Sequence, residues 1–468
     1  MIYKNKTIAT PIVPSTVQYY TLPGEASLDF KAICCFVATG FFLNDETYYV
    51  NQKAFRPATS YFFDEQGNVS RSERHFLWHY SPRTISFHQA LDEFTHLLES
   101  IVKRDTANKK IIIPISGGLD SRTLAATLTG NQNVFAYSYQ FEGGPRENEY
   151  GEAVAKASSF PYQAFSISKG YLWSVISELA QINKCYAEFI NPRQMAIWQK
   201  LMPQGDLFLL GHGGDLFFDS MGVADDLSNE DQQNYLVKKL IKPAGWQLGE
   251  QLWNAWGLSG NFKQYLFERI GDLLGTIQIE NANARLRAFK TEYYVARWTA
   301  VNLEIFKRQL PISLPFFDDA MCRFICTVPE EHLAGRKLEI EYLKRKAPSL
   351  ASIPWQKYFP CNLYNYTDFD TLSVKFQRGL VKGTRELKKG ILGITSDKRN
   401  WELQFLGKSN SEALQSHLFD RSFDRFVPAS IVRSNFELFE QNPDQYTHSI
   451  TMLLTLSLFN QLFHKRID

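Results

Sequence analysis

Apolar residues in the first part of the chain, up to about residue 75, form short runs rich in Tyr, Phe and Thr. The runs are interrupted at Pro23-Gly24 and at Gln66-Gly67-Asn68, which predicts short strands joined by turns. A helix is predicted next, because Gln89 follows Ser86 by three residues, the spacing of a capping box. Apolar residues then recur at helical spacing, at Phe87, Leu91, Phe94, Leu97, Leu98, Ile101 and Val102.

The pattern changes at Lys110, after which strands and helices are predicted to alternate. Residues 111–113 are three isoleucines, as expected for a strand buried on both faces of a parallel sheet. The next elements are a helix that ends at Gly130, a strand over 134–141, a helix over 147–157, a strand over 162–167, two helical stretches and a strand over 207–210. This alternation predicts an α/β fold with a doubly wound parallel sheet. From about Ser228 the pattern is mostly helical, which adds a helical C-terminal part to the small β-rich N-terminal region.

Composition narrows the classes of function. Lys and Arg number 51 against 49 Asp and Glu, a formal charge of +2, which argues against a dedicated nucleic-acid binder. The longest apolar stretch, from Ala32 to Phe42, is far shorter than the roughly 20 residues that span a bilayer. The six cysteines are too scattered for a disulfide scaffold. With no secretion signal at the start of the chain, we expect a soluble, reduced, cytoplasmic protein without a membrane span.

The strongest chemical signal is the turn between the isoleucine strand and its helix. Adjacent glycines let the backbone approach a ligand closely, and the start of the helix offers N–H groups and partial positive charge to a polyphosphate. A carboxylate in this turn would repel phosphates unless it held Mg²⁺, which would bridge it to them. The alternative is a tight turn without a ligand. The turn reads Ser116-Gly117-Gly118-Leu119-Asp120-Ser121.

This string resembles the pyrophosphatase loop of the N-type ATP pyrophosphatases, which cleave ATP between the α and β phosphates. Three further stretches are similar to the synthetase domain of asparagine synthetases. They are the acidic helix start at 147–155, the glycine-rich loop at 210–218 (Leu-Gly-His-Gly-Gly-Asp-Leu-Phe-Phe) and the Leu-Pro-Phe-Phe-Asp segment at 314–318. The resemblance extends from roughly residue 28 to residue 360 and implies an adenine nucleotide α-hydrolase-like fold.

The resemblance also implies site residues. ATP would bind at Ile115, at the loop Ser116, Gly117, Gly118, Leu119, Asp120 and Ser121, near Tyr139, and at Gly211. Asp120 and Asp215 would hold Mg²⁺. A cation is needed for the leaving pyrophosphate, and the candidates are Lys357, preferred, and Lys307, Arg308 and Arg122. For Arg122 a salt-bridged surface residue is the alternative, and for Asp215 a helix cap.

Two departures from the family affect function. His212 stands where the family has a Glu, so it either acts as a base near neutral pH or signals a different substrate or lost activity. A glutaminase of this family needs Cys as its first residue after Met removal, whereas this chain begins Met1-Ile2-Tyr3, and Cys34 and Cys35 fit a core. We therefore expect the amine to be free ammonia, ammonia from a separate partner subunit, or an amine on a second substrate.

The resemblance implies three parts. Residues 1–80 would be a β-rich remnant of a glutaminase-like domain, 81–360 the ATP-pyrophosphatase synthetase domain, and 361–468 a helical C-terminal extension. The predicted function is an ATP-dependent ligase that forms an amide through an acyl-adenylate, with a small-molecule carboxylate or a peptide or polysaccharide precursor as substrate, catalysed with His212, Asp215 and Lys357. The alternatives are a nucleotide-binding pseudoenzyme that scaffolds partners, or another enzyme of the superfamily such as a tRNA-modifying ligase. The basic stretch from Lys375 to Arg399 is either a solvated helix face or a surface for an anionic membrane, a glycolipid or a partner.

Overall fold

The computed structural model describes residues 3–144, 147–190, 193–371, 374 and 398–464, and these contain a 5-stranded parallel sheet with the strand order β10-β9-β6-β7-β8. The strands are β6 (Ile111–Pro114), β7 (Val134–Phe141), β8 (Tyr162–Ile167), β9 (Leu207–Leu209) and β10 (Ile312–Ser313). The first of these strands in the sequence, β6, lies at the centre of the sheet. The strands β7 and β8 follow on one side of it, and β9 and β10 are then added on the other side. This order is that of a doubly wound sheet, which binds ligands where the direction reverses, between the carboxyl ends of β6 and β9. The predicted fold class is confirmed.

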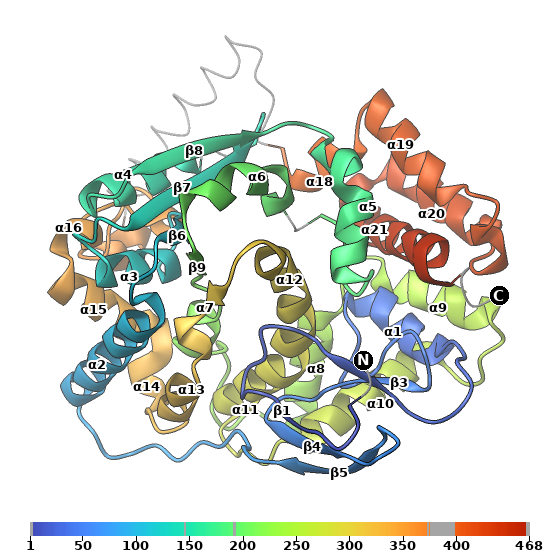
Figure 1. The fold of residues 1–468 in the computed structure, drawn as a ribbon, viewed down its shortest axis with the longest axis horizontal. Helices are drawn as coiled ribbons and strands as arrows, with labels where there is room; N and C mark the ends of the chain where they lie inside the picture. Colours follow the sequence, from blue (N-terminus) through green and yellow to red (C-terminus); the bar gives the residue numbers. More distant parts are fainter. Residues whose placement is uncertain (1–2, 145–146, 191–192, 372–373, 375–397, 465–468) are drawn as a thin grey trace.

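Helices cover both faces of this sheet (Figure 1). On one side α2 (Phe87–Thr106), α3 (Asp120–Thr127), α4 (Asn148–Ala157) and α15 (Lys337–Lys346) pack together, and on the other lie α5 (Tyr171–Asn183) and α12 (Ala300–Gln309). The predicted capping box at the start of α2 is confirmed. The Gln89 N–H donates to Ser86 Oγ over 3.3 Å, and the Ser86 N–H donates to Gln89 Oε1 over 2.9 Å.

The N-terminal region forms two small antiparallel sheets. One contains β1 (Thr7–Ala9), β4 (Thr59–Phe63) and β5 (Val69–Arg74), and the other pairs β2 (Tyr19–Thr21) with β3 (Gln52–Ala54). The prediction of strands and turns alone was wrong for Phe30–Thr39, which forms helix α1. Asp29 caps this helix by accepting from the Ala32 N–H, and Gly40 ends it with φ of 85°. Residues 32–39 are all buried, so the apolar run has no amphipathic period that would show the helix in the sequence.

The rest of the chain is mostly helical, as predicted. The helices are α6 (Trp198–Leu201), α7 (Gly214–Phe217), α8 (Asn229–Leu240), α9 (Gly245–Ala255), α10 (Phe262–Gly275), α11 (Ala282–Phe289), the π-helix η3 (Lys290–Thr299), α13 (Asp319–Ile325), α14 (Glu330–Leu333), α16 (Pro348–Ala351), α18 (Asn400–Phe405), α19 (Lys408–Leu418), α20 (Ala429–Gln441) and α21 (Pro443–Phe459). Helix α1 packs against α9, and the Phe459 ring of α21 stacks on Tyr48 with 3.6 Å between centroids. One hydrophobic cluster contains buried residues from all three predicted parts, whose boundaries at 80 and 360 stay predictions.

Within the described ranges, no helix has both the length and the apolar character that crossing a bilayer requires. All six cysteines lie in these ranges, where each is buried and none forms a disulfide. Most of the basic stretch from Lys375 to Arg399 lies outside the described residues, which resume at Lys398.

Candidate active site

The two glycine-rich turns lie side by side at the carboxyl ends of β6 and β9. A Cβ atom on Gly211 would lie 3.0 Å from Asp120 Cβ, and one on Gly214 would lie 2.6 Å from Asp120 Oδ1. The distance at Gly214 is too short for non-bonded atoms and the one at Gly211 is tighter than most Cβ contacts, so glycine at these positions lets the second turn close over the carboxylate. Asp120, at the start of α3, is therefore clasped between the turns.

We expect Gly214→Ala to displace the Asp120 carboxylate, because the new methyl group would overlap its oxygen. Any reaction that depends on this carboxylate should slow by about 10²-fold, the usual cost of moving a reacting group by about 1 Å. Gly275→Ala is the matched control, since a Cβ there meets nothing within 4 Å. Equal rates of ATP turnover in the two variants would contradict the arrangement.

The predicted site residues line two adjoining cavities. The first, called the main cavity, has a volume of about 460 Å³, and the second, called the loop cavity, about 500 Å³. The main cavity is lined by the predicted residues Ile115, Ser116, Asp120, Ser121, Tyr139, Gly211, His212 and Asp215. The loop cavity is lined by Gly117, Gly118, Leu119, Asp215 and Lys357 of the predicted set. Asp215 lines both cavities, so it marks their junction.

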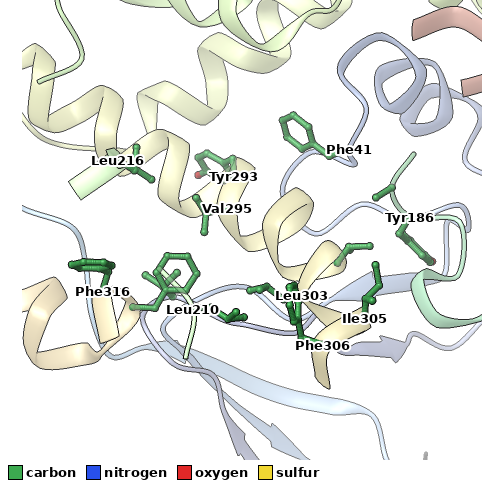
Figure 2. Close-up of a cluster of buried hydrophobic side chains, with 14 of the residues drawn as sticks. Phe41, Tyr186, Leu210, Leu216, Tyr293, Val295, Leu303, Ile305, Phe306 and Phe316 are labelled. Carbon is green, nitrogen blue, oxygen red and sulfur yellow. The ribbon is translucent and has the colours of Figure 1, made fainter. Parts of the chain in front are cut away.

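Part of the main cavity wall is apolar. Figure 2 shows Leu216, Val295 and Phe306, which line this cavity, within a cluster of buried hydrophobic side chains. Such a wall is typical of a small-molecule site, in which a few polar groups fix the orientation of a ligand.

Hydroxyl groups hold the first loop in shape. The Ser116 N–H donates to Ser121 Oγ over 3.1 Å, and the Gly118 N–H donates to Ser116 Oγ over 3.2 Å. No side chain caps the start of α3 at Leu119. The N–H groups of the first helical turn are therefore available to an anion.

Lys357 is brought to this loop by a backbone contact and by Arg122. The Gln356 N–H donates to the Gly117 carbonyl over 3.3 Å, which places the neighbouring Lys357 in the loop cavity. The Lys357 ammonium lies 6.0 Å and 5.3 Å from the ring centroids of Trp355 and Tyr358, within reach of cation–π attraction. Neither Lys307 nor Arg308 is among the residues that line the two cavities.

Both interpretations of Arg122 were wrong. Its side chain is fully buried, and it donates to the carbonyls of Gly117, Leu350, Ile353 and Pro354 over 3.4, 3.2, 2.9 and 3.0 Å. Burial lowers the pKa of this guanidinium to about 10. Arg122 therefore fastens the segment that carries Lys357 to the first helix after the loop.

Sequence reasoning missed Arg336, the cation next to Asp120. The Nη2 atom of Arg336 contacts carboxylate oxygens of both Asp120 and Glu339. The Nε atom of Arg336 donates to Glu339 Oε2 over 2.7 Å. Burial and Asp215 raise the pKa of Asp120, whereas Arg336 and the Asp215 N–H lower it. No local sequence signal could have found Arg336, because 216 residues separate it from Asp120.

Comparison with known proteins identifies the family of this chain. The model of the asparagine synthase family matches residues 93–347, more than half of the chain. The chain belongs to the asparagine synthase family. A search of curated proteins found no match. Among solved structures, the NMN synthetase from Francisella tularensis is similar over 44% of this chain and 92% of that chain, with 13% identity and a TM-score of 0.22, a likeness too loose to carry an argument. Membership of the asparagine synthase family makes this protein a ligase-type synthetase that uses ATP.

The acidic residues of this asparagine synthase-family site fit Mg²⁺. Among the described residues there is no group of three or more His, Cys, Asp or Glu side chains that could hold a metal alone. Mg²⁺ is commonly held by one or two carboxylates together with substrate phosphates and water, and Asp120 and Asp215 offer two carboxylates beside the loop. The cationic Arg336 on Asp120 shows that this position already attracts positive charge.

His212, at the position of the family's Glu, faces the main cavity. Its ring is accessible from the cavity and lies 6.4 Å from the Phe306 ring, edge to face. Desolvation lowers the pKa of His212 to about 4, and Asp215 opposes this shift. At neutral pH the imidazole is therefore neutral and can accept a proton. It is a weaker base than the sequence predicted, because the prediction was a base that acts near neutral pH.

We expect the His212 ring resonances to stay at their neutral-form positions from about pH 8 to about pH 5.5 and to titrate near pH 4, in NMR spectra assigned with His212→Gln. The surrounding protein disfavours the charged imidazolium, which is why the midpoint falls. A midpoint near 6.5, the ordinary histidine value, would show that water in the cavity solvates the ring fully.

The π-helix η3 supplies residues that sequence reasoning missed. Lys290, Tyr294 and Trp298 recur four positions apart and line the main cavity. Burial lowers the pKa of Lys290, and Asp215 raises it. Trp298 stacks on Tyr294 with 5.3 Å between centroids and donates from Nε1 to Glu188 Oε2 over 3.2 Å. The helical period was readable in the sequence, but which face meets the cavity depends on tertiary packing.

Proposed function

We propose that this protein is an ATP-dependent ligase that activates a carboxylate as an acyl-adenylate, releases pyrophosphate and forms an amide. One observation carries the proposal. Two glycine turns clasp Asp120 in the wall of a partly apolar main cavity, which adjoins an anion-suited loop cavity at Asp215. A nucleotide whose phosphates occupy the loop cavity would leave its α-phosphate near Asp215, with the main cavity open to a second substrate.

The bonds change in two steps. A carboxylate oxygen of the substrate attacks the α-phosphorus, the bond from that phosphorus to the bridging oxygen breaks, and pyrophosphate leaves. An amine nitrogen then attacks the acyl carbon, the carbon–oxygen bond to AMP breaks, and the nitrogen loses a proton. His212, which is neutral and lines the main cavity, would accept this proton.

The residues of the loop cavity stabilise the leaving group. Backbone N–H groups of the loop and the ammonium of Lys357 would face the pyrophosphate. Asp120 and Asp215 would hold Mg²⁺, which offsets phosphate charge when bound. Preorganised charge of this kind is effective because the groups need not rearrange during the reaction.

The main cavity contains a cationic side chain that suits an acidic substrate. Lys290 is partly buried there, and its ammonium is available to a carboxylate of the acyl substrate. We propose a small-molecule acid or a peptide or polysaccharide precursor as the acid. The amine would be free ammonia, ammonia from a partner subunit, or an amine on a second substrate, and the reaction would take place in the cytoplasm.

A nucleotide-binding scaffold without activity is the second candidate. Two observations favour it: His212 in place of the family's Glu, and the contact of Arg336 with Asp120. Pyrophosphate release with Mg-ATP should be measured over a panel of amino acids, sugar acids and peptides, with and without ammonium, alongside calorimetric titration with ATP. Release that depends on an acid supports the ligase. ATP binding without release from any acid would support the scaffold.

A further inference from the structure

Arg336 is held rigidly at the edge of the loop cavity. Its side chain is only 11% exposed, and its Nε–H donates to Glu339, whose side chain is 0% exposed. The contact is made within the first turn of α15, which begins at Lys337. Burial raises the pKa of the Glu339 carboxyl, and Arg336 opposes this shift, so the carboxylate depends on the guanidinium for its charge. Glu339 is thus an anchor that fixes Arg336.

The backbone at Arg336 is strained in a way that aims the side chain. Arg336 has φ of 60° and Gly335 has φ of 73°, two successive left-handed residues. The Gly335 N–H donates to Asp219 Oδ1 over 2.9 Å, and Asp219 also lines the loop cavity. A non-glycine residue keeps such a conformation only where its surroundings require it, and strained residues cluster at functional sites.

The guanidinium of Arg336 lies between Asp120 and the loop cavity. Its Nη2 contacts Asp120, while Arg336 as a whole lines the loop cavity together with Lys357. Toward the described residues, Arg336 donates hydrogen bonds from Nε and Nη2 and none from Nη1. The arrangement therefore leaves donors for a further anion in the cavity.

We propose that Arg336 binds the departing pyrophosphate, and that before nucleotide binds the same guanidinium neutralises Asp120 at the place that Mg²⁺ would take. The inference rests on the proposed function for the identity of the anion. When the metal binds to Asp120, Arg336 loses that contact but stays with Glu339, because a lone buried carboxylate would be costly. Its Nη atoms are then directed to the phosphates alone. Arg336 is thus a second cation for the leaving group, beside Lys357.

The test uses the full chain without nucleotide. The double variant Arg336→Gln with Glu339→Gln removes the fully buried Glu339 charge together with its partner, and the Asp120 carboxylate that loses Arg336 is 26% exposed, so folding should persist, which a thermal melt checks. Mn²⁺ binding followed by electron paramagnetic resonance should become about tenfold tighter, because a competing cation has left Asp120. Binding of pyrophosphate in the presence of Mg²⁺, followed by calorimetry, should weaken by about tenfold or more. These two changes have opposite signs, which a general loss of structure cannot produce.

Two further variants make the result specific. Asp120→Asn added to the double variant should abolish the gain in Mn²⁺ affinity. Arg345→Gln, on the same helix but paired with the exposed Asp92, should change neither affinity. Mn²⁺ affinity that stays the same or falls in a folded double variant would overturn the role at Asp120, and unchanged pyrophosphate affinity would overturn the role toward the leaving group. Neither measurement needs turnover, so failure of wild-type protein to release pyrophosphate with any acid would refute the proposed function separately.

Discussion

Asp120→Asn is expected to lower the rate of acid-dependent pyrophosphate release from ATP by about 10³-fold, because under the proposed function the change removes one of the two carboxylates that would hold Mg²⁺ beside the phosphates. Asparagine has nearly the same shape, so the side chain still fits between Gly211 and Gly214. Arg336 keeps its bond to Glu339, so folding should change little. Single-turnover release of pyrophosphate at saturating Mg-ATP is the measurement.

Asp92→Asn is the matched control for this experiment. Asp92 is 67% exposed and pairs with Arg345 on the surface, where a single ion pair contributes at most about 1 kcal/mol. The control should release pyrophosphate at the wild-type rate. If Asp120→Asn matched it, the carboxylate between the turns would have no part in the chemistry, and the metal would have to be sought elsewhere.

The parts of the fold that depend on local sequence were predictable. The strands over 134–141 and 162–167 have the predicted limits, because each is an apolar segment bounded by polar or turn residues. The same reasoning missed α1, whose fully buried residues have no helical period, and β10, which is two residues long and pairs with β9 only through the tertiary fold. Very short strands and helices buried on all sides therefore leave no pattern in the sequence that would reveal them.

The residues of the candidate site likewise fall into those that a local sequence pattern reveals and those that depend on the tertiary fold. The two glycine turns were visible because each lies within a short stretch between a strand and a helix, and the order of the strands then brings them together. Arg336, Glu339 and Lys290 come from helices far along the chain, and their place depends on how those helices pack. The charges that balance Asp120 therefore could not be read from the sequence.

Arg122→Ala is expected to lower the free energy of unfolding by about 3–5 kcal/mol, because it removes a fully buried side chain with its hydrogen bonds to backbone carbonyls and leaves a cavity. One carbonyl belongs to Gly117 in the loop, and the others belong to Leu350, Ile353 and Pro354, just before the segment that carries Lys357. Denaturation by urea is the measurement, together with pyrophosphate release. Activity should fall as well, since Lys357 is no longer held at the loop.

Arg122→Lys tests whether the hydrogen bonds of Arg122 or only its positive charge are needed to hold the segment that carries Lys357. It keeps a cation in the core, but a single ammonium lacks the planar fork with which the guanidinium donates to four carbonyls at once. We expect a smaller loss of stability than in the alanine variant, with pyrophosphate release still slowed because the Lys357 segment is loosened. Arg71→Ala, which removes a 60% exposed side chain paired with Glu73, should leave both quantities unchanged. If the lysine variant released pyrophosphate at the wild-type rate, Arg122 would support folding without positioning Lys357.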